Sequence, residues 1–333
     1  MPRLSTSLLL KSIDDALAES NASGILISDT QRNPRRYVVQ AGQNMFEMWV
    51  YIWTLTHGGG AARPKNEYRI QITGITPPIA RNPAGPTVIM GYEPNLGCFA
   101  GFDLSKHHTF STRSPSIQIP ITALHQALQD GFSFTTKGNE EITIGIRPDQ
   151  LLAYVLNAKM LHAQGSDAAT VGLLSRAVAL EEIRPNEIEQ IPAERRRVIQ
   201  TVSRLSRDSS FRRKVLNAYE QRCAVTRIQL RLIDAAHILP VGVENSNDEV
   251  ANGICLSPTY HRAYDNGLIY LDEDLFMKIN PEKEKELREV GLAGGLEVFK
   301  GYLNSRIHLP QDRNQWPAMA FIHSANKFRK ILN

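Results

Sequence analysis

A chain of 333 residues with 42% hydrophobic and 22% charged side chains has ordinary globular composition and room for two domains. It contains no internal repeat and no long low-complexity segment, which excludes solenoid and disordered classes. The net charge of +4 is compatible with a nucleic-acid partner, and three widely spaced cysteines favour a reducing compartment.

The N-terminal segment predicts a packing helix. Leu9, Ile13 and Leu17 have helical spacing, which indicates an amphipathic helix over residues 8–22. Charged residues interrupt the apolar run 7–10 at once, so we expect neither a signal peptide nor a membrane span. We therefore expect a cytoplasmic protein with no membrane partner.

A region rich in strand signals follows, from about residue 25 to residue 155. Proline residues and a Gly-Gly-Gly triplet separate runs of β-branched and aromatic residues, and a helix is predicted near 121–129. The predicted strands are 46–55, 67–72, 87–92, 98–102 and 142–146. These patterns predict a mixed domain built on a sheet.

The next region, 148–208, carries helical apolar spacing at 150–156 and 169–174, with breaks at 165–167 and 184–186. The most basic stretch of the chain, 193–214, comes directly before the segment with the strongest motifs. Such a charge run is typical either of a solvated helix face or of contact with a nucleic-acid backbone.

The segment 223–272 is where we expect chemistry. A short apolar strand over 231–238 carries His237 near its end, and the Asn252-Gly253 pair is typical of a turn. Ser257-Pro258 opens a predicted helix on which His261 and Asp265 lie four residues apart, and a strand returns at 267–271. The two side chains therefore share one helix face and can converge on one metal ion.

These segments resemble the HNH (ββα-metal) nucleases, a family built on a hairpin followed by a helix. The matching motifs are Cys-Ala-Val-Thr at 223–226, Asp-Ala-Ala-His-Ile at 234–238, Asn-Gly-Ile-Cys-Leu at 252–256 and His-Arg-Ala-Tyr-Asp-Asn-Gly-Leu-Ile at 261–269. The resemblance implies that His237 is the general base and that His261 and Asp265 hold the metal. Asp234 is implied as a further ligand or as a partner that orients an imidazole. Asn252 is implied to tie the loop together, although in relatives this position can lie near the metal.

Hydrolysis of a phosphodiester explains these residue types. An imidazole titrating near neutrality can take the proton of the attacking water, and a divalent cation neutralises charge on the phosphoryl oxygens. Oxygen ligands with one imidazole suit Mg or Mn, although Ni, Co or Zn could also bind. Cys223 and Cys255 lack a C-x-x-C partner, so we expect no structural zinc and read both, with Cys98, as buried thiols.

A second resemblance concerns the first domain, which is similar to the sulfur-binding domain of McrA-like type IV restriction enzymes. The segments that carry it are 66–71, 103–108 and 112–118. Those enzymes recognise phosphorothioated DNA, in which sulfur replaces a non-bridging phosphate oxygen. The resemblance implies a pocket rimmed by Tyr68 and Arg69 and walled by Ser114 and Pro115. His107, His108 and Arg113 are implied to hold the flanking DNA backbone.

The sequence thus predicts an α+β fold with a DNA-recognition domain at 1–155, a helical connector at 156–205 and an HNH nuclease domain at 206–333. The C-terminal part is expected to carry helices from about 281 and over 314–328. The predicted function is metal-dependent restriction of modified double-stranded DNA, with phosphorothioate as the preferred mark, and a homodimer would supply two active sites.

Two alternatives remain open. The enzyme could read a methylated base or an unmodified sequence, for which Trp49, Tyr51 and Trp53 offer an aromatic cage, although their alternation is more simply strand packing. In the other alternative, the protein is a non-catalytic DNA-binding protein in which the hairpin is only scaffold.

Overall fold

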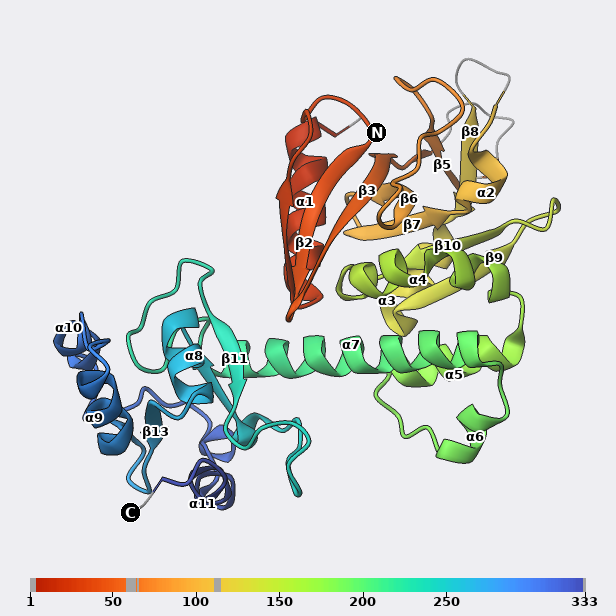
Figure 1. The fold of residues 1–333 in the computed structure, drawn as a ribbon. Coiled ribbons are helices and arrows are strands. Elements are labelled where there is room, and N and C mark those ends of the chain that lie inside the picture. The colour runs from red at the N-terminus through yellow and green to blue at the C-terminus, as the bar shows by residue number, and fades with distance from the viewer. Residues whose placement is uncertain (1–3, 58–63, 65, 111–114, 332–333) are drawn as a thin grey trace. The chain divides into compact units, whose positions relative to one another are not determined.

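The computed structural model describes residues 4–57, 64, 66–110 and 115–331, and the chain folds into two compact units, Met1–Ser209 and Ser210–Asn333. Figure 1 traces the course of the chain. Helix α7 (Ala193–Ala218) crosses the boundary between the units: Ile199 and Val202 belong to the core of the first, and Phe211 and Val215 to the core of the second.

The first unit is built on a seven-stranded sheet in the order β1-β2-β3-β6-β7-β10-β9, in which only the β3–β6 pair is parallel among the pairs of the described residues. A smaller sheet has the order β4-β5-β8. The strands are β1 (Ala22–Leu26), β2 (Arg35–Ala41), β3 (Asn44–Thr54), β4 (Thr56–His57), β5 (Glu67–Gln71), β6 (Thr87–Glu93), β7 (Cys98–Phe102), β8 (Ser116–Pro120), β9 (Phe132–Thr136) and β10 (Ile142–Ile146).

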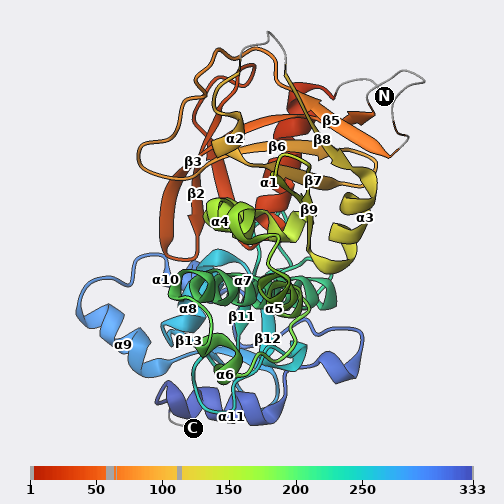
Figure 2. The same cartoon turned by 90° about the vertical axis from the view of Figure 1, so that its right-hand side faces the viewer.

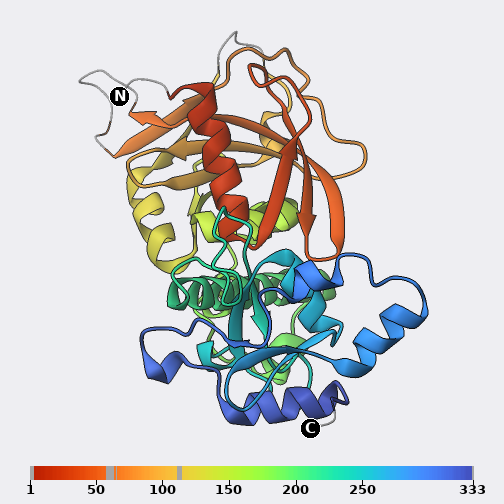
Figure 3. The same ribbon diagram turned by 90° about the vertical axis from the view of Figure 1, so that its left-hand side faces the viewer.

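The two faces of the large sheet are covered differently, as the views in Figures 2 and 3 show. Alternation along β6 sends Val88 and Met90 to one core and Ile89 to the other. The first core receives α1, α4, α5 and part of α7, while the second receives α3 and the small sheet. The helices are α1 (Thr6–Glu19), α2 (Leu104–His107), α3 (Ile121–Asp130), α4 (Leu151–Gln164), α5 (Ala168–Val178) and α6 (Pro185–Glu189), with a 3-10 turn at Pro148–Gln150.

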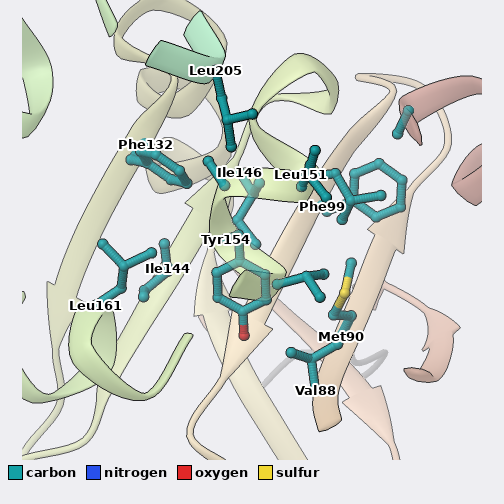
Figure 4. Close-up of a cluster of buried hydrophobic side chains, with 14 of the residues drawn as sticks. Val88, Met90, Phe99, Phe132, Ile144, Ile146, Leu151, Tyr154, Leu161 and Leu205 are labelled. Carbon is teal, nitrogen blue, oxygen red and sulfur yellow. The ribbon is translucent and has the colours of Figure 1, made fainter. Parts of the chain in front are cut away.

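Tyr154 shows how closely α4 lies on the sheet. Its ring lies among the apolar side chains in Figure 4, over Gly101 of β7. A Cβ atom at Gly101 would come within 2.4 Å of the tyrosine oxygen, so the absence of a side chain there permits the approach. The phenol shares a hydrogen bond of 3.0 Å with His162, which satisfies both buried groups.

The second unit contains a two-stranded sheet, a three-stranded sheet and four helices among its described residues besides its part of α7. Its elements are β11 (Asp234–His237), β12 (Gly253–Leu256), α8 (Pro258–Asp265), β13 (Ile269–Leu271), β14 (Phe276–Ile279), α9 (Pro281–Glu289), α10 (Leu296–Lys300), β15 (Ser305–Arg306) and α11 (Met319–Phe328), with 3-10 turns at Val250–Asn252 and Arg313–Gln315. The mixed α+β class predicted from the sequence is confirmed.

Three predicted boundaries are wrong for identifiable reasons. The strand expected over 231–238 is shorter, because Leu230 and Arg231 have positive φ angles that a strand cannot accommodate. The strand expected over 267–271 begins only at Ile269, after Gly267 at φ +69°. The helix expected over 314–328 begins at Met319, because Pro317 favours an extended residue before it, and Trp316 is extended.

All three cysteines are buried free thiols, as predicted. Burial raises the pKa of the Cys98 and Cys255 thiols to about 12, so both stay protonated at neutral pH. Within the described part of the chain, none of the helices has the length and apolarity needed to cross a membrane.

Candidate active site

The second unit presents its chemistry on a short hairpin and the helix that follows. Strands β11 and β12 pair antiparallel, with Asp234 opposite Leu256 and His237 opposite Gly253. Ser257 is an extended N-cap and Pro258 is the first residue of α8, which carries the next candidate residues. The sequence motif is therefore folded as two strands and one helix.

His237 is the last residue of β11 and is held on two sides. Its Nε2 atom lies 3.0 Å from Asp248 Oδ1, in the loop that joins the two strands. Its ring stacks on the ring of Phe211 from α7, with centroids 3.7 Å apart and planes at 11°. The side chain keeps 18% of its surface exposed, so the imidazole is restrained yet remains accessible to solvent.

Asn252 is fully buried and connects separate parts of the loop. Its Oδ1 atom accepts a hydrogen bond of 2.8 Å from the Leu239 amide, and its Nδ2 group donates to the carbonyls of Leu239 and Asn247 at 3.2 and 2.9 Å. Nδ2 also lies 3.3 Å from Ser246 Oγ. Both the carbonyl and the amino group of this side chain therefore bind parts of the loop.

Gly253, opposite His237, lets α7 approach the hairpin. A Cβ atom at this position would lie 2.3 Å from Val215 Cγ2 and 3.2 Å from two ring atoms of Phe211. The glycine thus leaves the space in which Phe211 stacks on His237.

We expect Gly253→Ala to destabilise the second unit by about 1–3 kcal/mol, because the added methyl group overpacks a closed contact. Thermal unfolding measures this loss. Gly294→Ala is the matched control, because a Cβ atom there meets nothing within 4 Å and no positive φ is recorded. Equal melting temperatures for the two variants would contradict the prediction.

Three of the predicted metal-site residues form a continuous chain of contacts. His261 Nδ1 lies 3.5 Å from Asp234 Oδ2, and His261 Nε2 lies 3.3 Å from Asp265 Oδ2. Arg212 of α7 pairs with the other oxygen of Asp234 at 3.2 Å and donates to the Ile233 carbonyl at 2.9 Å. The hydrogen bond from His261 lowers the pKa of Asp234, and Arg212 adds to this against the opposing effect of burial, so Asp234 is anionic at neutral pH.

Two of these side chains fit a divalent cation. A carboxylate oxygen and an imidazole nitrogen, each about 2.1 Å from one ion, lie at most about 4.2 Å apart, and Asp234 Oδ2 and His261 Nδ1 satisfy that limit. Asp265 lies at the opposite ring nitrogen, where it suits an orienting role better than ligation of the same ion. Among the residues that the structure describes, no group of three or more His, Cys, Asp or Glu side chains is arranged as a ready metal cluster.

The residues predicted to contact DNA in the first unit have mixed surroundings. His107 shares a hydrogen bond of 2.6 Å with the buried carboxylate of Glu141, which Lys137 also contacts, so this imidazole is engaged within the fold. His108 Nδ1 lies 3.1 Å from the Ser105 carbonyl and stabilises the turn after α2. Burial alone would raise the pKa of Glu141, but its two partners outweigh this and hold the pKa below its usual value.

The predicted sulfur-pocket residues are only partly described. Tyr68 and Arg69 lie half-buried on β5, whereas Arg113 and Ser114 fall outside the described residues. The Pro115 carbonyl accepts a hydrogen bond from the Ile72 amide. Ile72 follows Arg69 by three residues, which corresponds to roughly 10 Å of extended chain. Tyr68 and Arg69 are consecutive in β5, so their side chains point to opposite faces of the small sheet, with Tyr68 on the face that packs against the core. The described residues therefore bring neither Tyr68 nor Pro115 next to the Arg69 side chain.

The basic stretch of α7 divides into engaged and exposed residues. Arg195 pairs with Asp167, Arg196 donates to the carbonyls of Glu189 and Ile191, and Arg212 belongs to the site. The exposed members are Arg197, Arg204, Arg207, Arg213 and Lys214.

Sequence reasoning missed three residues that contact the candidate groups: Asp248, Phe211 and Arg212. Asp248, one of two acidic residues in the loop 244–248, could have been weighed as a histidine partner. Phe211 and Arg212 were visible only as parts of a helix leading into the motif, because the contact between α7 and the hairpin is tertiary.

Comparison with known proteins assigns two segments of the chain. Residues 223–272 match the family model of the HNH endonucleases, and residues 46–155 match the model named methylase-associated X1. HNH endonucleases generally use a divalent metal ion. No curated protein matches the chain.

One similar solved structure is a chain named modification dependent TagI restriction endonuclease. The match covers 92% of this chain and 87% of that one at 13% sequence identity, with a TM-score of 0.28. At this score the two folds do not superimpose as wholes, so the similarity carries no conclusion about function.

Proposed function

We propose that this chain, an HNH-type DNA endonuclease with an N-terminal methylase-associated X1 domain, is a restriction enzyme directed at modified double-stranded DNA. The observation that carries the nuclease part is the folded motif itself. A histidine that is partly exposed ends the first strand, and a carboxylate–imidazole pair lies between that strand and the following helix.

The proposed reaction is hydrolysis of one phosphodiester bond. His237 accepts a proton from a water molecule, whose oxygen forms a bond to phosphorus while the bond to the leaving deoxyribose oxygen breaks. The leaving oxygen takes a proton from solvent. A second group beside the site, the Arg212 guanidinium, adds fixed positive charge near the phosphate.

Asp234 and His261 would hold the divalent ion, for which Mg or Mn is proposed because the donors are one oxygen and one imidazole nitrogen. When bound, such an ion neutralises charge on the phosphoryl oxygens. Asp265 is assigned to orient His261 through Nε2.

The proposed mark is a phosphorothioate, read by the first domain. Its support is the sequence resemblance at 66–71 and 112–118, and Arg69 lies half-buried on β5, where a guanidinium can meet an anionic backbone. A homodimer, in which each protomer cuts one strand, is part of the same proposal.

A second candidate target is a modified base. A cavity of about 480 Å³ in the first unit is lined by Trp53, by the buried Arg35 and by the amide side chains of Gln31, Asn33 and Gln71. An aromatic face with polar groups around it is the chemistry that an extruded base needs. Tyr51 is only 2% exposed and belongs to the core, so the three-ring cage raised from the sequence is not formed.

The experiment compares matched duplexes that are unmodified, phosphorothioated in one stereochemical form, or cytosine-methylated, with Mg or Mn and with chelator. We expect cutting of the phosphorothioated duplex alone, lost with chelator. Arg69→Ala should weaken that preference roughly 10- to 100-fold, the value of one charged hydrogen bond of about 1.5–3 kcal/mol. The exposed Arg81 serves as the control, as Arg81→Ala.

Each of the other cleavage outcomes would point to a different function. Preference for the methylated duplex would replace the sulfur proposal by the base-reading one, and equal cutting of all three would discard selection of modified DNA. Absence of cutting under every condition would favour the non-catalytic DNA-binding alternative.

A further inference from the structure

We infer that Asp248 and Phe211 are positioning residues that fix the tautomer and the plane of His237, leaving its Nδ1 atom as the proton acceptor. The inference rests on the proposed role of His237 as the general base and adds the groups through which that role is controlled. None of the residues involved belongs to the Asp234–His261 pair assigned to the metal.

The tautomer follows from the contact with Asp248. A carboxylate oxygen only accepts hydrogen bonds, so the 3.0 Å contact requires the proton to lie on His237 Nε2. In a neutral imidazole the other nitrogen is then unprotonated. Nδ1 is therefore the atom that can take a proton from water.

The plane of the ring follows from the contact with Phe211. A centroid separation of 3.7 Å and an angle of 11° describe a face-to-face stack, which leaves the imidazole free to move only within its own plane. The lack of a side chain at Gly253, the strand partner of His237, gives Phe211 the room to make this stack. The hydrogen bond to Asp248 then fixes the remaining rotation.

Asp248 is itself held in place by the buried amide of Asn252. Asn252 Nδ2 donates to the carbonyl of Asn247, the residue directly before Asp248, and lies 3.3 Å from Ser246 Oγ. The carboxylate is thus presented by a loop segment anchored to the hairpin. Asn252 thus positions the loop, the loop positions Asp248, and Asp248 orients His237.

Two measurements on the full chain test the inference. The first is the imidazole nitrogen spectrum of protein labelled with ¹⁵N-histidine, with the His237 resonances assigned by their absence in His237→Ala. We expect an unprotonated Nδ1 in the wild type. In Asp248→Asn, whose amide can donate to Nε2, we expect the Nδ1-protonated tautomer to gain population.

The second is single-turnover cleavage of a duplex that the wild type cuts, together with its dissociation constant. Asp248→Asn should slow cleavage roughly 10- to 100-fold and leave affinity within about twofold, because a misplaced base affects the chemical step. Phe211→Leu, which keeps the apolar contact but removes the aromatic ring that stacks on His237, should slow cleavage less than Asp248→Asn does. Glu244→Gln makes the same exchange at an exposed carboxylate of the same loop and is the control.

The inference is overturned if Nδ1 carries the proton in the wild type, or if Asp248→Asn leaves both the tautomer and the cleavage rate unchanged. Since Asp248 is 41% exposed, its side chain is not needed to fill a core, and a melting temperature equal to that of Glu244→Gln verifies the fold. The spectrum needs no DNA, so a failure to find modification-dependent cutting would reject the proposed function without deciding this inference.

Discussion

His237→Ala is expected to lower the rate of phosphodiester cleavage about 10²- to 10⁴-fold, the contribution of a general base. The substitution removes the imidazole that ends β11 and leaves the Asp234–His261 pair intact. DNA affinity should therefore stay close to that of the wild type. Single-turnover cleavage and equilibrium binding of the same duplex separate these two effects.

The control for this variant is His323→Ala, which removes an imidazole that is 57% exposed and pairs with Glu273 elsewhere in the same unit. It should cut at the wild-type rate. Because His237 stacks on Phe211, the melting temperature of His237→Ala must also be measured. A variant that folds and still cuts within threefold of the wild type would remove His237 from the reaction.

The HNH motif was predictable because its signals are local. Strand, turn and helix follow one another within fifty residues, and the four-residue spacing of His261 and Asp265 already places them on one face of α8. The N-cap and first residue of α8, Ser257 and Pro258, also announce the helix start in the sequence. What the sequence could not predict is the hairpin's tertiary partner, α7, which brings Phe211 and Arg212 to the site.

The first unit was predicted less completely. Strands β1, β2, β4, β8 and β9 were not recognised, although the five others of this unit were. Both β1 and β8 lie at sheet edges or in the small sheet, and their residues alternate between half-buried and other environments without a long apolar run. β2 begins with two arginines, of which Arg35 is nevertheless buried in the folded unit. Composition alone does not predict such a strand, because the burial of this arginine depends on contacts with other segments of the folded chain.

Asn252→Asp is expected to cost the second unit several kcal/mol, since it removes an amide donor from a fully buried position. The carbonyls of Leu239 and Asn247 lose their donor, at about 1–3 kcal/mol for each stranded acceptor. The new carboxylate also faces those oxygens in a buried site, which penalises its charged form. Hydrogen–deuterium exchange of peptides from 210–333 under native conditions measures the loss as reduced protection.

Asn245→Asp makes the same exchange at an exposed position of the same loop and should leave protection unchanged. The comparison also separates two roles implied for Asn252. If its amide acts only through the loop, Asn252→Asp loses cleavage in proportion to the loosening of 239–248, while a carboxylate beside the ion would instead alter the metal concentration needed for cutting. The four hydrogen-bonding contacts of the buried amide favour the first result, because both polar groups of Asn252 already bind the loop.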